Sequence, residues 1–184
     1  MVVGTVARLF DNKGYDEIIE AMPQALRREP RLRFVWIGDG TRRPRYERRL
    51  VRLGLRDRVH FVGLISPEEV AQRLNGFDMV LHASRWEGLP RALVQGLLTE
   101  VPAISFDNDG APEVVLPGQT GILVPFGDTA GLGDAIVALA GDPELRQRLG
   151  QAGRNHCLDL FDWRKMVADI ESLYKKLASP SRPL

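Results

Sequence analysis

The stretch SRWEGLPRALVQG gathers groups that could bind an anionic, hydroxyl-rich ligand. Glu87 stands just before a helix that we expect to begin at Pro90, and Gln95 follows on the same helix. With proline at the first helical position, the backbone N–H groups of Arg91 and Ala92 should be free to bind an anion, which the helix dipole also favours. The segment therefore predicts an anion site beside a carboxylate.

The same stretch also has a purely structural interpretation. Gly88 permits a close approach of the backbone. Gly96 inside the expected helix costs about 1 kcal/mol relative to alanine, so we expect the helix to pack closely on a strand there. A capped helix after a loop needs no ligand, and the residues alone leave this alternative open.

A second group of charges lies in ARLFDNKG, near the start of the chain. Arg8 and Lys13 share one loop after an apolar run, and Gly14 and an expected helix follow. Two cations at the end of a strand suit a diphosphate, arginine through a bidentate fork and lysine as a point charge. Exposed cations on a loop are also common, so this pair alone does not decide the matter.

Two further loops contain glycine. Gly38 and Gly40 form a Gly-x-Gly turn, but the dinucleotide fingerprint requires a third glycine where this chain has Arg43. We interpret the turn as a place where backbone approaches a ligand. Asp107 and Asp109 spell Asp-x-Asp, a spacing that could hold a divalent metal. We expect them instead to be turn and cap residues.

The histidines and the cysteine carry less information. His60 and His156 are expected to be structural. His82 ends the fourth apolar run beside the expected cleft, where it either has a structural role or contacts a ligand. The histidines and Cys157 lack metal-ligand spacing, so we expect no metal site. No Ser/His/Asp arrangement is visible.

Apolar runs and amphipathic segments alternate along the chain. The apolar runs are nearly continuous, as in strands that are covered on both faces. We expect strands at 2–7, 32–37, 59–62, 79–81, 103–106 and 121–124, and helices at 15–28, 44–53, 67–75, 90–98, 112–116, 129–140, 143–157 and 162–177. This alternation predicts an α/β fold with a doubly wound, Rossmann-like parallel sheet. Ligands bind such sheets beyond the carboxyl ends of the strands, which places the expected site in the loops 8–14, 38–43, 63–66, 82–90 and 107–113.

Composition sets outer limits. The 184 residues are 44% apolar and 27% charged with a net charge of +1, which indicates an ordinary globular domain and gives no reason to expect nucleic acid as a partner. Eight arginines crowd between positions 42 and 58, either on a solvated amphipathic helix or as a basic patch for anionic lipid. The chain has no run of 18 apolar residues, no signal-peptide pattern and a single cysteine. We therefore expect a cytoplasmic location, and the arginine-rich segment adds peripheral contact with a membrane as an open alternative.

The ends of the chain raise two expectations. VVGTVARLF begins inside a strand-like apolar run, so we expect sequence upstream of residue 1. The folded domain should cover 1–178, and the tail 179–184, which contains SPSRPL, should be disordered.

In this order, ARLFDNKGYDEIIEAM, RFVWIGDG, DRVHFVG, SRWEGLPRALVQG, VPAISFDNDGAPEVV, GQTGILVP and FDWRKMV resemble the donor-binding, C-terminal half of retaining GT-B glycosyltransferases of group 1, family 4. The resemblance covers about residues 2–177. It implies one half of a two-domain enzyme with its active site in the cleft, an N-terminal acceptor domain missing from this chain, and a last helix that returns toward that domain. It also implies a UDP- or GDP-sugar as donor, with no cofactor and no essential metal.

The resemblance also implies a role for each matching position. Arg8 and Lys13 would hold the diphosphate, Glu87 would contact the sugar, and the residue at position 95 would bind the ribose hydroxyls. Four backbone segments complete the implied donor site. The helix start at Leu89, Pro90, Arg91 and Ala92 would lie at the phosphates. The turn at Gly38 and Gly40 and the segment at Val62 and Gly63 would face the base, and the loop at Asp109, Gly110 and Ala111 would lie near the sugar.

One position departs from the family pattern. Gln95 stands where the family usually has glutamate, and an amide offers one neutral acceptor oxygen where a carboxylate could accept from both ribose hydroxyls. We expect weaker donor binding as a result. Gln95 is also the feature that favours a degenerate module that binds a nucleotide-sugar without transferring it. A third alternative, an unrelated nucleotide-binding domain such as a dehydrogenase fragment, is disfavoured by Arg43.

Overall fold

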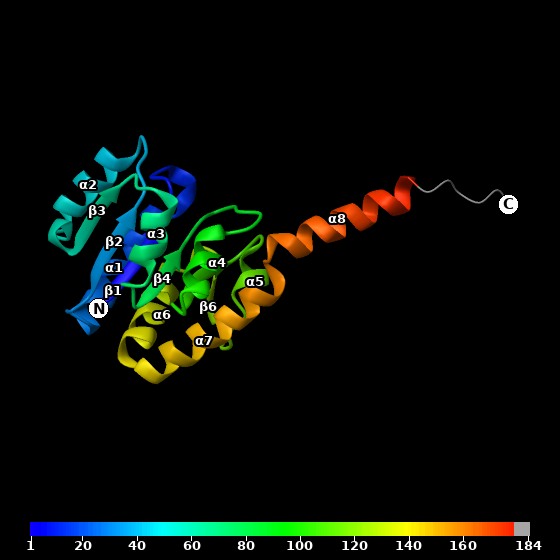
Figure 1. The fold of residues 1–184 in the computed structure, drawn as a ribbon. Helices are drawn as coiled ribbons and strands as arrows, with labels where there is room; N and C mark the ends of the chain where they lie inside the picture. Colours follow the sequence, from blue (N-terminus) through cyan, green and yellow to red (C-terminus); the bar gives the residue numbers. More distant parts are fainter. Residues whose placement is uncertain (179–184) are drawn as a thin grey trace.

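Six parallel strands form one sheet, in the order β3-β2-β1-β4-β5-β6 (Figure 1). This computed structural model describes residues 1–178, and the predicted tail 179–184 lies outside the described residues. The strands are β1 (Val2–Val6), β2 (Arg33–Ile37), β3 (Val59–Gly63), β4 (Met79–His82), β5 (Ala103–Asp107) and β6 (Gly121–Pro125). The predicted strands and the parallel, doubly wound sheet are confirmed.

Helices connect the strands and follow the last one. They are α1 (Tyr15–Arg28), α2 (Arg43–Arg52), α3 (Pro67–Leu74), α4 (Arg91–Leu98), α5 (Ala111–Val114), α6 (Thr129–Gly141), α7 (Pro143–Leu160) and α8 (Trp163–Ala178), with short 3-10 turns η1 (Asp11–Lys13) and η2 (Arg56–Arg58). The predicted helices are all present, with ends that shift by a few residues. The turns η1 and η2 were not predicted.

Helices cover both faces of the sheet, which explains the continuous apolar strands. On one face α1, α2 and α6 pack around a core that includes Tyr15, Trp36 and Tyr46. On the other face α3, α4, α5 and α7 share a second core, which includes Val80 and Leu97. The rings of Tyr15 and Trp36 meet edge to face at 4.6 Å between centroids.

The predicted close packing at Gly96 is confirmed. A Cβ built on Gly96 would lie 2.7 Å from the Val80 Cγ2 atom of β4, nearer than real Cβ contacts. Glycine at this point lets α4 lie directly on the strand, and this contact offsets its poor helix propensity. Ser66 and Glu69 form a reciprocal capping box that fixes the start of α3.

The order of the strands reverses between β1 and β4. The chain winds from β1 to β2 and β3 on one side and then crosses through α3 to β4 on the other. At such a reversal the loops after the two central strands separate and leave a crevice at the carboxyl edge. The loops that follow β1 and β4 carry the charged residues singled out in the sequence.

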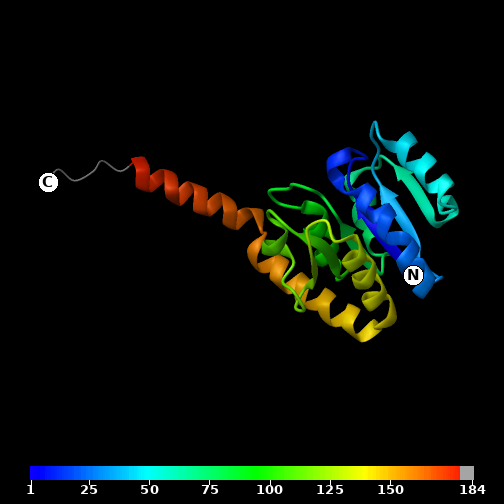
Figure 2. The ribbon, with the colours of Figure 1, turned by 180° about the vertical axis from the view of Figure 1, so that it is seen from behind.

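α8 extends away from the rest of the structure, as both views show (Figures 1 and 2). No residue of α8 is buried. Its apolar residues recur at helical spacing and are all exposed: Trp163, Met166, Val167, Ile170, Leu173, Tyr174 and Leu177. Within residues 1–178 this apolar face is uncovered. None of the helices described is both long and apolar enough to cross a membrane.

Candidate functional site

A cavity of about 530 Å³ lies at the reversal point. Its walls come from the loops after β1 and β4, the start of α4, and α3 with the loop before it. The lining residues are Val6, Ala7, Arg8, Lys13, Ile65, Pro67, Val70, His82, Glu87, Arg91, Ala92 and Gln95. The structure thus brings together the residues predicted for diphosphate, sugar and ribose, which lie up to 87 positions apart in the chain.

Lys13 and Glu87 join the two loops across the reversal point. The Lys13 Nζ donates to Glu87 Oε2, and the Ser84 Oγ donates to the same oxygen at 3.3 Å. Burial alone would raise the pKa of the Glu87 carboxyl, but the hydrogen bond and charge of Lys13 outweigh it, so the pKa lies below its usual range. Glu87 is therefore ionised, and an oriented carboxylate faces the cavity.

The loop after β5 holds the backbone of Glu87. Glu87 N donates to the Asp109 Oδ2 at 2.9 Å, and Gly110 N donates to the Glu87 carbonyl at 3.2 Å. A Cβ on Gly110 would lie 1.8 Å from the Gly88 carbonyl oxygen, so only glycine fits there. Asp109–Ala111, predicted to lie near the sugar, thus lies against Glu87. Ala111 begins the short helix α5 and is buried.

Asp107 and Asp109 show no metal cluster. Within residues 1–178, no group of three or more His, Cys, Asp or Glu side chains lies close enough together to hold a metal ion. Asp109 lies in the turn before α5, which agrees with the predicted turn role, and its carboxylate accepts from the Glu87 N–H. The predicted cap role is wrong, because Gly110 is the N-cap of α5 and Asp107 is the last residue of β5. That transfer needs no essential metal stays a prediction.

The residues predicted to face the base lie beside the loop of Arg8. Gly38 N donates to the Gly63 carbonyl at 2.9 Å, and Val62 directly precedes Gly63 in β3. A Cβ on Gly38 would lie 2.2 Å from the Ala7 carbonyl, and Gly38 has a φ of 128°, so both space and backbone call for glycine. A Cβ on Gly40 would lie 2.6 Å from the Leu9 carbonyl oxygen.

The start of α4 corrects one prediction. Pro90 is the N-cap residue and not the first helical residue, with φ −75° and ψ 80°. This is close to an inverse γ-turn, in which the Arg91 N–H donates to the Leu89 carbonyl, here at 2.8 Å. The Arg91 N–H is therefore not free for an anion. The Ala92 N–H has no partner within residues 1–178, so one of the two predicted amides is available.

Positive charge dominates the cavity. Its lining holds Arg8, Lys13 and Arg91 against the single carboxylate of Glu87, a balance of three cations to one anion. Arg8 is exposed, makes no ion pair within residues 1–178, and lies over the Phe10 ring at 4.8 Å. An unpaired guanidinium of this kind suits an anionic ligand.

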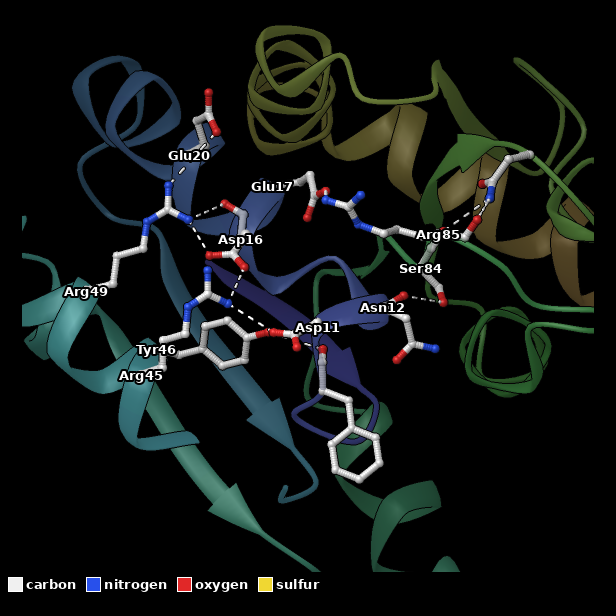
Figure 3. A network of polar contacts seen from close by, with 12 residues as sticks. Asp11, Asn12, Asp16, Glu17, Glu20, Arg45, Tyr46, Arg49, Ser84 and Arg85 are labelled. Carbon is white, nitrogen blue, oxygen red and sulfur yellow. Dashed lines mark hydrogen bonds and ion pairs between the residues drawn. The ribbon is translucent and has the colours of Figure 1, made fainter. Parts of the chain in front are cut away.

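The arginines of α2 hold the loop after β1 in place (Figure 3). Arg45 bridges Asp11 and Asp16, and Arg49 also pairs with Asp16. The Tyr46 hydroxyl donates to the Phe10 carbonyl at 3.1 Å. These contacts tie α2 to the segment between Arg8 and α1, so most of the arginine cluster has a structural role.

Two arginines of α2 have no acidic partner in the part of the chain that the structure describes and could still bind an anion. Arg48 and Arg52 make no ion pair within residues 1–178 and line a groove of about 750 Å³ along α2 with Val51. This groove is larger than the cavity at the reversal point but contains none of the predicted site residues. The smaller cavity is the better candidate site, because several loops after strands converge there. Lipid contact by α2 stays a prediction.

The loop after β4 contains two residues that the sequence analysis missed. The Ser84 Oγ donates to Glu87 Oε2 and to the Asn12 carbonyl. Figure 3 shows Ser84 beside Asn12 and the Arg85 guanidinium, which pairs with Glu17 of α1 at 2.6 Å. Together they fasten the loop of Glu87 to the loop of Lys13. Their position just before Glu87, after a predicted strand, was the available signal.

His82, which the sequence left between two roles, lines the cavity. It is the last residue of β4 and is 5% exposed. Burial lowers its pKa to about 4, although Glu87 acts in the opposite direction, so the imidazole is neutral at pH 7. Its Nε2 atom lies 3.9 Å from Glu87 Oε2, too far for a hydrogen bond.

Comparison with known proteins adds family information. The family model described as glycosyl transferases group 1 matches residues 1–156. An alpha-D-kanosaminyltransferase of Streptomyces kanamyceticus is 34% identical over 82% of this chain and 39% of its own length. A putative glycosyltransferase, EpsD, of Bacillus subtilis is 34% identical over 91% of the chain and 44% of its own length. The chain thus spans less than half of these relatives.

A solved structure gives the same picture. The Anabaena protein Alr3699/HepE, crystallised with UDP and glucose, superposes with a TM-score of 0.87 and is 25% identical. The match covers 95% of this chain and 48% of that protein. The structural neighbours are GT-B glycosyltransferases, so the Rossmann-like fold expected for one half of such an enzyme is confirmed.

Proposed function

Because this chain belongs to the glycosyl transferases of group 1, we propose that it binds a nucleotide-diphosphate sugar in the cavity between the loops after β1 and β4. The observation that carries the proposal is the convergence of Arg8, Lys13 and Arg91 with the start of α4 in one cavity. Family membership argues against the alternative of an unrelated dehydrogenase fragment.

For the residues in and beside the cavity we propose the roles that the family resemblance implies. Arg8, Lys13 and the Ala92 N–H bind the diphosphate, Glu87 contacts the sugar, and Gln95 takes the ribose hydroxyls. The turns at Gly38–Gly40 and Val62–Gly63 face the base. UDP is the first candidate for the nucleotide, since a structural relative was crystallised with UDP and glucose.

Transfer then proceeds with retention at the anomeric carbon. The bond from this carbon to the diphosphate breaks, and the nucleoside diphosphate leaves with the electron pair. The acceptor oxygen bonds to the carbon and gives up its proton. Preorganised cations and an amide aimed at the leaving diphosphate stabilise the charge that develops there. The departing diphosphate, which gains the electron pair, takes this proton.

A further domain completes the enzyme. The chain spans 39% and 44% of its two relatives above, and the apolar face of α8 is uncovered within residues 1–178. We propose that an N-terminal acceptor domain covers this face, closes the cleft and excludes water. This chain alone should be catalytically inert. Transfer of sugar by residues 1–184 alone would contradict the proposal.

Thermal unfolding with UDP- and GDP-sugars tests donor binding. With a Kd of about 1 mM and about 10 mM ligand, the stabilisation is roughly 1.4 kcal/mol, or roughly 2–5 °C in Tm. A shift with one base and not the other identifies the nucleotide, and Arg8→Met should remove most of the shift. The absence of any shift would contradict donor binding by this chain.

A binding module without transfer activity is the second candidate, and the exposed Gln95 in the cavity favours it. It predicts that the complete protein binds the nucleotide-sugar without consuming it. Release of nucleoside diphosphate in the presence of acceptor separates the two candidates.

A further inference from the structure

His82 is a buried polar side chain with an unmet hydrogen bond. Its Nε2 atom is enclosed and has no hydrogen-bond partner within residues 1–178. A buried polar atom left unpaired costs about 1–3 kcal/mol, and most buried polar atoms are paired. This exception lies in the wall of the cavity, which suggests that the missing partner belongs to the function of the site.

The nearest charged group is Glu87. The Glu87 Oε2 lies 3.9 Å from the His82 Nε2, about 1 Å farther than in a typical hydrogen bond. In the structure this oxygen accepts from Lys13 and Ser84 instead. A neutral imidazole carries one N–H, so His82 with its proton on Nε2 can donate to a carboxylate. Because the Nε2 atom is enclosed, it would act on a ligand in the cavity indirectly, by orienting the Glu87 carboxylate.

Donor binding would change the balance around Glu87. A diphosphate carries more negative charge than one carboxylate, so a diphosphate bound at Lys13 draws the ammonium group toward itself and weakens its hydrogen bond to Glu87. The carboxylate then needs another donor to stay oriented. A movement of about 1 Å brings it within reach of the His82 Nε2–H.

We propose that His82 is a positioning residue that takes over the Glu87 carboxylate when a donor diphosphate engages Lys13. The proposal rests on the proposed function, since it assumes that Lys13 binds phosphate and Glu87 binds sugar. In the exchange, Lys13 turns from Glu87 to the diphosphate while His82 and Ser84 hold Glu87 toward the sugar. His82 would thereby support recognition of the sugar and not of the nucleotide.

The first test needs no nucleotide. Nitrogen-15 NMR of labelled histidine follows the Nε2 resonance of His82 in the wild type and in Lys13→Met. Removing the lysine should move Glu87 onto His82 and shift this resonance toward a hydrogen-bonded N–H. Adding Glu87→Gln to Lys13→Met should reverse most of the shift. Lys165→Met, on exposed α8, is the control, and Lys13→Gln replaces Lys13→Met if that variant does not fold. An unchanged resonance in a folded Lys13 variant would overturn the proposal.

The second test uses the nucleotide that stabilises the chain. His82→Leu should weaken nucleotide-sugar binding by about five- to tenfold and leave nucleoside diphosphate binding within about twofold, and His82→Gln, with an amide donor, should recover part of the loss. His60→Leu, at an exposed position of β3, is the matched control. Equal effects on both ligands, or none, would overturn the proposal. If the wild type binds no nucleotide, the proposed function fails, and the NMR test still decides whether His82 can hold Glu87.

Discussion

The side chain of Lys13 donates to the Glu87 carboxylate across the point where the order of the strands reverses. The two residues lie 74 positions apart in the chain and on different loops. Their contact locates the site more sharply than either loop does, because it joins a cation of one loop to the single carboxylate of the cavity. It also means that a ligand must compete with an existing ion pair.

Arg8→Met should weaken the binding of a nucleoside diphosphate by roughly 10- to 150-fold, the equivalent of one charge-assisted hydrogen bond of about 1.5–3 kcal/mol. Arg8 is exposed and without an ion pair within residues 1–178, so its loss leaves no partner unpaired. Isothermal titration with UDP and GDP measures the effect. Arg52→Met, on the outer face of α2, is the control, and equal affinities for the two variants would remove Arg8 from the site.

Gln95→Glu should tighten nucleotide binding about fivefold. A carboxylate forms charge-assisted bonds to ribose hydroxyls, worth about 1 kcal/mol more than those of an amide. The same titration, repeated with the 2′-deoxy nucleotide, tests the origin of the gain, which should shrink when one hydroxyl is missing. Unchanged affinity in Gln95→Glu would contradict the proposed contact between residue 95 and the ribose hydroxyls.

Gly96→Ala should lower the free energy of unfolding by about 1–3 kcal/mol, although alanine is the better helix former. The added Cβ would lie 2.7 Å from Val80 Cγ2, so the helix or the strand must move. Chemical denaturation measures the change. Gly141→Ala, also at a helical glycine but with open space around it, should be neutral or slightly stabilising. Similar values for both variants would show that the contact with Val80 is unimportant.

The pKa of His82 predicts how stability depends on pH. Because burial lowers the pKa of His82 to about 4 from 6.5, the unfolded chain takes up this proton first as the pH falls. The stabilisation is complete above about pH 6.5 and is lost between about pH 6.5 and 4. Denaturation of the wild type and His82→Gln at pH 7 and 5 measures the difference.

The wild type should lose about 2 kcal/mol more than His82→Gln between pH 7 and pH 5. The pKa of the Glu87 carboxyl is lowered, so its contribution to stability is lost at still lower pH. The effects of the two groups on stability can therefore be told apart by pH. Parallel curves for the two proteins would contradict a buried neutral imidazole.

The sequence by itself determined the elements and the chemistry of the loops. Continuous apolar runs between amphipathic segments specified strands that are covered on both faces, and these local preferences survive in the structure because burial and hydrogen bonding act in the same direction. The loops with Arg8, Lys13 and Glu87 could be named because functional loops follow strands in such sheets. The close packing at Gly96 was also predictable, because glycine is unfavourable inside a helix unless a close contact compensates for it.

Only the tertiary structure decided how these pieces meet. Strand order sets which loops adjoin, so the bond between Lys13 and Glu87 could not be read from either segment. The Arg91 N–H was lost to a γ-turn that depends on the ψ of Pro90, an angle that proline does not restrict as it does φ. The enclosure of His82 likewise depends on the helices that cover β4. Local sequence specifies what a residue can do, whereas its neighbours come from distant segments whose arrangement no local pattern contains.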